Sequence, residues 1–569
     1  MPPQEARTPT PRYLTQLRQN LINCFDEDEL HALCGDVQVD YEDLPGQGKA
    51  GKARGLIAFL ERRGRIPELI EICSRQRPHV RWEDTSDQQL LASLESEFVN
   101  RQSELNLLNV ERLRTSLSPY VLISAPAGYG KSYLIRRLIA MMEADEVLCQ
   151  KWGYRYIDFS SQIGDSITYA VQSITGQSSQ HNPDAAMDLI CKYIVQRLAA
   201  PFAEGNTGRR GALLVFDAVE RLDEETGQWL GKLLGNLRRR TRSGQSEIVT
   251  VRVIIAGRNV EQFWSSYVST AFQLPAPQRI ELTPFEGNPI QDLVWRQGRA
   301  VQVNLDEQTV VQIASELQFL SGGHPHIICS LVEELAALSF AIGPVAEYFQ
   351  QQREPLVRKH IAPVVDGLLD ATEPPLAGAA RALSAFRRVN ANTVQALAEA
   401  GALVLPANTD EIKLLGDLQK VHLLSKPSIQ EPFYRGHLTR HILALDMAYS
   451  SRESRAQYRR LNQIALELYE RWIHNLGSGL PDTSLRATQR LLSVAEWLFH
   501  ALQDEAMNER RIRLGLQKHL QALTESSDML PVADLIVDEV ATDSEMCYLL
   551  RQRLGDDGVA IVSAWLKAA

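Results

Sequence analysis

The chain has 569 residues, of which 44% are hydrophobic and 23% are charged. This globular composition allows about four domains at roughly 150 residues each, and it excludes a disordered, collagen-like or coiled-coil chain. The formal charge of −10 argues against a general polyanion binder, although a local basic patch stays open.

The predicted location is the cytoplasm. The longest apolar runs, such as Tyr120–Ala125, are far shorter than the roughly 20 residues of a membrane-spanning helix. The first residues have no apolar core of the kind that a signal peptide needs. The seven cysteines form no Cys-x-x-Cys pair and no regular spacing, so a reducing compartment is the simplest interpretation.

The pattern over residues 12–82 predicts a bundle of short helices. Leu17 and Leu21 recur at the spacing of one helix face, and Asp26 with Glu29 has the spacing of a capping box. The residues expected inside the following helices are Leu30, Leu33, Ala53, Leu56, Ile57 and Leu60.

Short β-rich runs alternate with helical patterns over residues 98–286. The runs are Tyr120–Ala125, Tyr154–Phe159, Ala212–Asp217, Val249–Ala256 and Arg279–Leu282. This alternation is typical of an α/β fold with a parallel sheet. Beyond it almost only helical patterns occur, except over Ala402–Ser428, where short apolar runs flank polar turns.

The segment Ser124–Ser132 follows a strand and opens a helix, which is the setting that a phosphate-binding loop requires. Backbone N–H groups between small residues converge on phosphates there, and the helix N-terminus adds a positive dipole. Lys131 is expected to reach the β- and γ-phosphates of ATP, and Ser132 to ligate Mg²⁺. The usual first glycine is replaced by Ala125. The expected nucleotide-binding residues of the loop are Ala127, Gly128, Tyr129, Gly130, Lys131, Ser132 and Tyr133.

Asp217 ends a strongly apolar strand. We expect it beside the loop of a neighbouring strand, where it would help to hold a nucleotide-bound Mg²⁺. Glu220 is the expected residue that polarises an attacking water, with Glu224 and Glu225 as alternatives. An ordinary strand that ends in a helix cap is the other interpretation of this segment.

Arginines form two further motifs. Arg258 follows another buried strand and is a candidate to sense or stabilise the γ-phosphate, with a solvated loop arginine as the alternative. The run Arg238–Arg242 is expected to end a helix, where cations suit the dipole. An arginine finger across a subunit interface is the alternative for this run.

The order of these motifs resembles the STAND NTPases, a signalling branch of the AAA+-like ATPases that includes the NACHT and NB-ARC proteins. Phe98–Leu105 before the loop and Gly322–Pro325 after the sheet contribute to the resemblance, which covers roughly residues 95–450. The resemblance implies that Lys131, Asp217, Glu220 and Arg258 act on ATP. It also implies further nucleotide contacts by Val99 and Arg101 near the adenine, by Pro325 against the base, and by His437 of a winged-helix domain near the β-phosphate.

The N-terminal bundle resembles bacterial effector-associated domains, which are death-fold-like adaptors. The matching segments are Phe25–Leu30, Asp40–Gly46 and Lys49–Arg54. The resemblance implies homotypic recruitment rather than catalysis.

Charge is unevenly distributed along this bundle. Residues 26–43 carry eight acids and no Lys or Arg, whereas residues 49–65 carry six bases and one acid. Opposite charges on different segments allow head-to-tail docking between copies, which gives rings or filaments. The alternative is that both faces are solvated and neutralise each other within one bundle.

The expected fold is multidomain α and α/β. Its predicted parts are a disordered tail (1–11), an effector-associated adaptor (12–82), a linker (83–97), a P-loop NTPase core (98–286), a helical lid (287–375), a winged helix (376–450) and a C-terminal helical, TPR-like sensor domain (451–569).

The expected function is an ATP-dependent switch of a prokaryotic NLR-like defence system, with ATP or ADP and Mg²⁺ as cofactors. Oligomerisation would cluster the adaptors and recruit an effector with a matching adaptor, such as a caspase-like protease, after an unknown trigger at the C-terminal region. Slow, regulatory ATP hydrolysis is expected, with no membrane partner. The alternatives are an origin-binding-type or regulatory P-loop ATPase whose winged helix binds DNA, and a scaffold without catalysis.

Overall fold

The chain forms two compact units, residues Met1–Leu94 and Glu95–Ala569, which we describe separately. The computed structural model describes residues 17–18, 21–22, 25–37, 39–41, 44, 48–61, 65–76, 101–109, 118–161, 166–175, 187, 190–194, 210–242, 249–258, 260–269, 274–369, 372–406, 409–420, 423–425, 433–436, 439–475, 483–524 and 532–567. The predicted tail and linker, Val99 and His437 lie outside these residues.

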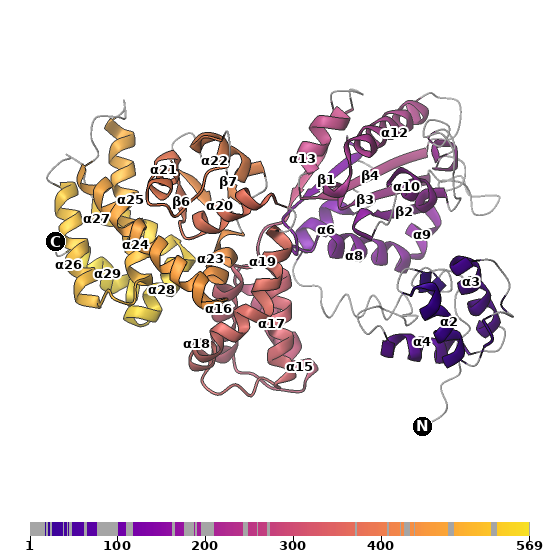
Figure 1. Cartoon of the computed structure of the whole chain (residues 1–569). Coiled ribbons are helices and arrows are strands. Elements are labelled where there is room, and N and C mark those ends of the chain that lie inside the picture. The colour runs from indigo at the N-terminus through magenta and orange to yellow at the C-terminus, as the bar shows by residue number, and fades with distance from the viewer. Residues whose placement is uncertain are drawn as a thin grey trace. The chain divides into compact units, whose positions relative to one another are not determined.

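The first unit is a helical bundle with α2 (Glu27–Asp36), α3 (Gly48–Glu61) and α4 (Ile66–Gln76) (Figure 1). The predicted capping box is confirmed, because Glu29 N donates to Asp26 Oδ1 at 2.7 Å and Asp26 N donates to Glu29 Oε2 at 3.1 Å. The predicted core is confirmed too, since these residues are at most 5% exposed: Leu17, Leu21, Leu30, Leu33, Ala53, Leu56, Ile57 and Leu60.

The second unit contains a five-stranded sheet whose strands are all parallel, in the order β2-β3-β4-β1-β5. The strands are β1 (Tyr120–Ser124), β2 (Trp152–Asp158), β3 (Arg210–Asp217), β4 (Val249–Gly257) and β5 (Gln278–Glu281). All five predicted strands are therefore confirmed within two residues at their ends. Continuous apolar runs are what strands buried on both faces require.

Helices cover both faces of this sheet (Figure 1). They are α6 (Gln102–Leu108), α8 (Lys131–Ala144), α9 (Glu146–Lys151), α10 (Ser166–Thr175), α12 (Glu224–Arg242) and α13 (Val260–Phe263), with the short turns η1 (Phe159–Ser161), η3 (Val219–Arg221) and η4 (Trp264–Ser269). Leu122 of β1 packs with α10 and α12, whereas Val121 and Ile123 pack with α6 and α8. This alternation follows from the two-residue period of a strand.

Helices dominate the rest of the second unit. The first group is α15 (Asn288–Ala300), α16 (Glu307–Ser321), α17 (Pro325–Ala337), α18 (Val345–Leu356), η5 (Val357–Ile361) and α19 (Ala362–Leu369). The last group is α24 (Arg452–Asn475), α25 (Thr483–Gln503), α26 (Glu509–Thr524), α27 (Val532–Thr542), α28 (Ser544–Leu554) and α29 (Gly558–Lys567). The helices of the last group vary from 24 to 10 residues, and a TPR-like arrangement stays a prediction.

A small antiparallel sheet, in the order β6-β8-β7, lies between these two groups along the chain. Its elements are α20 (Pro374–Ser384), β6 (Arg388–Val389), α21 (Ala391–Glu399), α22 (Glu411–Lys420), β7 (Leu424–Ser425), β8 (Tyr434–Gly436) and α23 (Arg440–Tyr449). A helix, a strand, two helices and two strands is the order that the predicted winged helix needs, and that assignment also stays a prediction.

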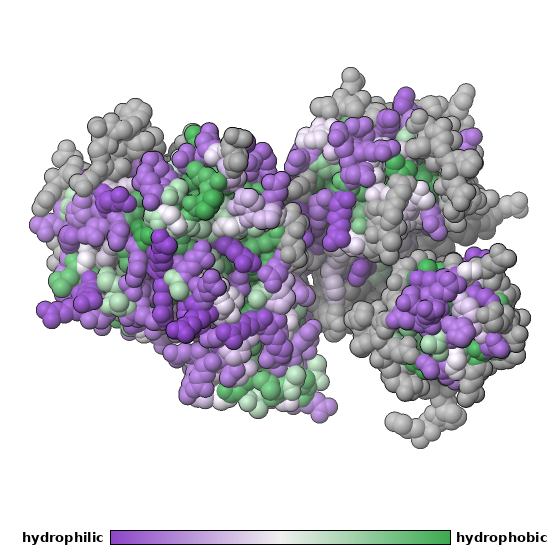
Figure 2. Space-filling model, viewed as in Figure 1, coloured by the Kyte–Doolittle hydropathy of each residue, from purple (hydrophilic) through white to green (hydrophobic). Residues whose placement is uncertain are grey.

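One hydrophobic core runs from Phe285 to Leu566, so the helices and the small sheet of this region pack as a single body. None of the helices that the structure describes is both long and apolar enough to cross a bilayer. In Figure 2 hydrophilic residues cover most of the coloured surface, and hydrophobic residues form small separate groups.

Candidate nucleotide-binding site

The predicted phosphate loop connects the end of β1 at Ser124 to the start of α8 at Lys131. Gly128 and Gly130 adopt φ values of +75° and +85°, a region that glycine enters without steric cost. Ala125, at the position of the usual first glycine, is not among the residues with positive φ. The alanine therefore fits this loop without backbone strain.

Lys131 folds back over the loop and is 9% exposed. Its ammonium donates hydrogen bonds to the carbonyl oxygens of Ala125 (2.7 Å) and Pro126 (2.9 Å). Burial lowers the pKa of Lys131 to about 8, although the carboxylates of Glu220 and Asp217 oppose this shift. A desolvated cation gains more from a phosphate than an exposed one does, because water screens it less.

Asp217 lies at the end of β3 and is only 1% exposed. It accepts hydrogen bonds from Tyr156 Oη at 2.8 Å, from Ala218 N at 2.9 Å and from the side chain of Ser132. Burial raises the pKa of Asp217, while the hydrogen bonds from Ser132 and Tyr156 act in the opposite direction. The two predicted Mg²⁺ ligands are thus adjacent, and both offer the oxygen atoms that Mg²⁺ prefers.

One detail of the prediction for Asp217 is wrong. The strand of Asp217 is not next to the strand of the loop, because β4 lies between β3 and β1. Ser132 bridges this gap from the first turn of α8, since its side chain reaches the Asp217 carboxylate.

Glu220 and Arg258 form a pair at the ends of β3 and β4. Arg258 N donates to Glu220 Oε2 at 3.1 Å, and Arg258 Nε lies 3.5 Å from Glu220 Oε1. Both also act on the pKa of Lys131. The alternatives Glu224 and Glu225 are exposed in the first turn of α12. The structure therefore brings Lys131, Asp217, Glu220 and Arg258 together at one edge of the sheet.

A cavity of about 430 Å³ opens between the loop and the helices α15 and α17. Of the predicted nucleotide-binding residues, it is lined by Arg101, Gly128, Tyr129, Gly130, Lys131, Ser132, Tyr133 and Pro325. The sequence analysis missed the other lining residues, which are Arg136, Phe285, Leu293, Gln297, His326, Cys329, Val332 and Glu333. The three- and four-residue spacings within α15 and α17 would have been a usable signal, since they mark one helix face.

His324 is a second residue that was missed, and it holds α17 against the loop. Its Nε2 lies 2.9 Å from the carbonyl oxygen of Ala127, its ring meets Tyr129 edge-on at 4.9 Å, and it is 0% exposed. A Cβ added at Gly128 would come within 2.3 Å of the His324 ring. Burial lowers the pKa of His324 to about 4, so the ring is neutral near pH 7 and donates its Nε2–H.

Arg101, predicted near the adenine, lies at the other end of the cavity just before α6. Its guanidinium donates to the carbonyl oxygen of Thr283, pairs with Glu104 at 3.0 Å and stacks over the ring of Phe285 at 4.8 Å. These contacts fix the chain between β5 and α15 beside the loop. Arg101 thereby links the start of the core to the first helix of the predicted lid.

The cavity fits a nucleotide with Mg²⁺. Its volume lies in the range of small-molecule sites, and a buried cation faces two adjacent oxygen ligands. The hydroxyl of Tyr129 is buried without a hydrogen-bond partner among the residues that the structure describes. A ligand in the cavity would supply a partner for it.

Two families match parts of the chain. Residues 17–78 match Effector-associated domain 7, and residues 105–258 match Nephrocystin 3, N-terminal. No curated protein matches the chain.

Solved structures with partial similarity include three ATPase-related proteins. The Walker-type ATPase PABY2304 of Pyrococcus abyssi superposes with a TM-score of 0.42 at 14% identity, over 61% of this chain and 95% of that one. The ORC2 protein of Aeropyrum pernix gives 0.42 at 12% identity, over 64% and 93%. The RuvB Holliday junction branch migration motor of Thermotoga maritima gives 0.31 at 13% identity, over 60% and 92%.

These scores are too low to carry an argument by themselves. The phosphate loop, the sheet order and the two family matches instead identify the chain as a STAND-like P-loop ATPase that carries an N-terminal effector-associated domain.

Proposed function

We propose that this chain is an ATP-dependent signalling switch of a prokaryotic NLR-like defence system. Nucleotide-controlled oligomerisation would cluster the effector-associated domains, which would recruit an effector protein such as a caspase-like protease. The observation that most supports this proposal is the contact between His324 and the phosphate loop. Because this contact joins the loop to α17, nucleotide binding and the position of the helical region are mechanically linked.

The residues of the site have distinct tasks in this proposal. The backbone N–H groups of residues 128–132 would surround the phosphates, Lys131 would neutralise their charge, and Ser132 with Asp217 would hold the metal. Bound Mg²⁺–ATP supplies the bond to be cleaved and the charge of the metal. Arg258 would exchange its pairing with Glu220 for the terminal phosphate, which frees Glu220 to orient a water molecule.

The core that runs from Phe285 to Leu566 supports a path from this cavity to the C-terminal helices. Pro325 and the residues of α15 and α17 line the cavity, and the same helices belong to that core. A ligand that binds two arrangements of these helices unequally shifts their populations, which is all that a switch needs. The trigger would act at the C-terminal end of this body.

The effector-associated domain offers fewer free charges than its sequence suggests. Lys52 donates to the carbonyl oxygens of Tyr41 (2.8 Å) and Leu44 (3.1 Å) and lies over the Tyr41 ring, so it holds the bundle together. Arg65 is similarly bound to Glu68 and to the carbonyl oxygen of Val37. Both therefore follow the alternative of charges satisfied within one bundle.

Exposed charges of both signs remain on this domain. Arg54 and Asp28 are exposed on different helices, α3 and α2. We propose that such residues make the contacts between copies. The variants Arg54→Glu and Asp28→Lys should each block clustering of the full chain without changing its affinity for ATP, and clustering that persists in both would contradict this proposal.

The switch itself is tested by Lys131→Ala. We expect the loss of ATP-dependent assembly in light scattering and at least about a hundredfold weaker ATP binding, because the buried cation is removed. Lys420→Ala is the matched control, since that lysine is exposed and pairs only at the surface with Asp417. Assembly that survives Lys131→Ala would reject the switch, and salt-dependent binding to duplex DNA would favour the DNA-binding alternative.

A further inference from the structure

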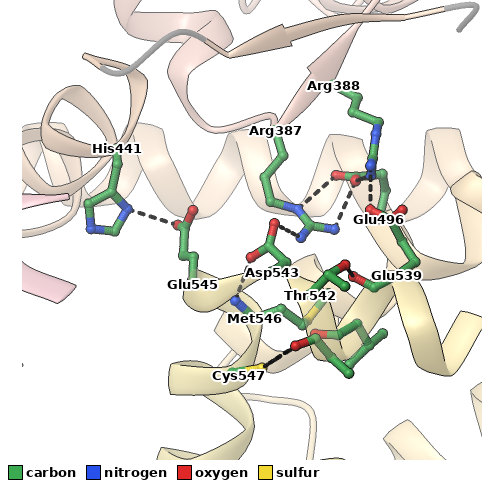
Figure 3. Close-up of polar contacts among 12 residues, drawn as sticks. Arg387, Arg388, His441, Glu496, Glu539, Thr542, Asp543, Glu545, Met546 and Cys547 are labelled. Carbon is green, nitrogen blue, oxygen red and sulfur yellow. Dashed lines mark hydrogen bonds and ion pairs between the residues drawn. The ribbon is translucent and has the colours of Figure 1, made fainter. Parts of the chain in front are cut away.

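A second polar cluster lies far from the phosphate loop along the chain. Figure 3 shows Arg387 and Arg388, at the start of β6, pointing toward Glu496 of α25. The distances to Glu496 Oε1 are 2.8 Å from Arg387 Nη2 and 2.6 Å from Arg388 Nη1, and Glu496 is 0% exposed. Arg387 also pairs with Asp543 at 2.6 Å, and Arg388 pairs with Glu539.

The helix α28 supplies carboxylates to two sides of this cluster. Asp543, its N-cap, contacts Arg387, while Glu545 contacts Arg440 and lies 3.2 Å from His441 Nδ1. Burial alone would raise the pKa of Glu545, but Arg440 and His441 outweigh it and lower this pKa to about 2. The attachment of α28 to β6 and α23 thus depends on two ionised carboxylates.

These contacts border a cavity of about 580 Å³ between α16, β6, β8, α23 and α28. Its basic lining residues are Arg387, Arg388, Arg440, His441 and Arg551, and its acidic lining residues are Glu286, Asp543 and Glu545. Arg388 Nε and Gln318 Oε1 are buried without hydrogen-bond partners among the described residues, and both residues line the cavity. The wall therefore holds an unused guanidinium donor and an unused amide acceptor.

The chemistry of the wall indicates what would bind there. Guanidinium groups match the geometry of phosphate oxygens, and an arginine-lined wall recognises them in several directions. A ligand with two negative charges can replace Asp543 and Glu545 one for one, so the buried arginines keep partners throughout the exchange. The stacked rings of Phe319 and Tyr548, with centroids 3.6 Å apart, add an apolar surface. A cavity of this volume suits a small molecule.

We propose that this second cavity is a binding site for a small molecule with two or more clustered phosphate groups. Its phosphates take the places of Asp543 and Glu545 on Arg387 and Arg440, and Arg551 adds a further contact. Where this inference rests on the proposed switch, the ligand acts as the trigger, because it detaches the start of α28 from β6 and α23.

The test measures binding to the full chain with the Lys131→Ala change, so that the phosphate loop does not contribute. Inorganic tripolyphosphate and ATP are titrated separately by calorimetry. Binding of tripolyphosphate assigns the site to free clustered phosphates, and binding of ATP alone assigns it to phosphates carried by a nucleoside. Either result supports the site if it depends on the residues of the wall.

Two added variants with opposite expected effects establish that dependence. Arg551→Gln should weaken binding at least about tenfold, and Asp543→Asn should strengthen it about tenfold, because it removes a competing charge. The Arg551 side chain is 51% exposed, and asparagine is a good N-cap, so both variants should keep the fold. Arg459→Gln, at a 59% exposed side chain paired with Glu505, is the control and should change nothing.

The absence of binding to either probe, or binding that ignores both variants, would overturn the proposal. That failure would be distinguishable from failure of the switch, since ATP-dependent assembly is measured with Lys131 in place.

Discussion

The two cavities of the second unit are built in different ways. The wall of the nucleotide cavity takes Gly128–Tyr133 from one continuous segment and gathers Lys131 and Arg101 there, with Arg258 nearby. The second cavity takes its wall from residues between Pro284 and Arg551, and Arg387, Arg388 and Arg440 each face a carboxylate. A local motif can hold a charge ready for a ligand, whereas a long-range cluster must first satisfy its own charges to be stable.

The largest effect is expected at the long-range cluster. Glu496→Ala leaves Arg387 and Arg388 without their shared buried carboxylate and should lower the free energy of unfolding by about 3–5 kcal/mol. The matched control is Glu505→Ala, whose carboxylate is 78% exposed and pairs with Arg459, at a cost of about 0–1 kcal/mol. Equal costs in urea denaturation would show that the buried cluster does not stabilise the unit.

The glycines of the phosphate loop provide the next test. Gly130→Ala meets nothing within 4 Å and should cost about 1–2 kcal/mol through its positive φ alone. Gly128→Ala should cost more, because its Cβ would also collide with the His324 ring. Adding His324→Ala should recover part of the difference in unfolding free energy. A lack of recovery would mean that the ring is not what the alanine strikes.

Replacement of His324 should have a smaller effect. His324→Ala removes the hydrogen bond to Ala127 and should cost about 1 kcal/mol or more, with weaker ATP binding as the loop loses its contact to α17. His324→Gln keeps a donor at a similar position and should restore most of both losses. If glutamine behaves like alanine, the hydrogen bond does not couple the loop to the helix.

The smallest effect concerns protons. Because the pKa of Lys131 is about 8, half of the lysines are neutral at that pH, and a bound triphosphate raises this pKa. ATP binding should therefore take up a fraction of a proton at pH 8 to 9, and affinity should fall as the pH rises through 8. Calorimetry in buffers of different ionisation enthalpy measures the uptake. Lys131→Arg, which stays charged, should remove the uptake.

Much of the nucleotide site was predictable from the sequence. The five strands were identified because parallel strands buried on both faces need uninterrupted apolar runs, and a strand, a glycine-rich turn and a Lys-Ser pair mark the loop. The tertiary structure was needed to identify His324 as the residue that reaches the loop. It was needed likewise for the internal role of Lys52, which the charge pattern had grouped with the exposed bases.

The second cavity was not predictable, because its partners are distant in sequence. Arg388 and Glu496 are 108 residues apart, and Arg440 and Glu545 are 105 apart. Each residue alone has the pattern of a solvated surface charge or a helix end. Nothing local distinguishes such a charge from a buried one, since burial depends on which helices pack around it.

The sequence by itself therefore determined the local chemistry of this protein: a phosphate loop, an acidic strand end, a capped adaptor helix and the alternation that makes a parallel sheet. Only the tertiary structure decided which helix closes over the loop, which strand separates Asp217 from it, and which carboxylates hold α28. The physical reason is range. Backbone geometry and helix caps are set by residues a few positions apart, whereas packing and buried ion pairs join residues that only folding brings together.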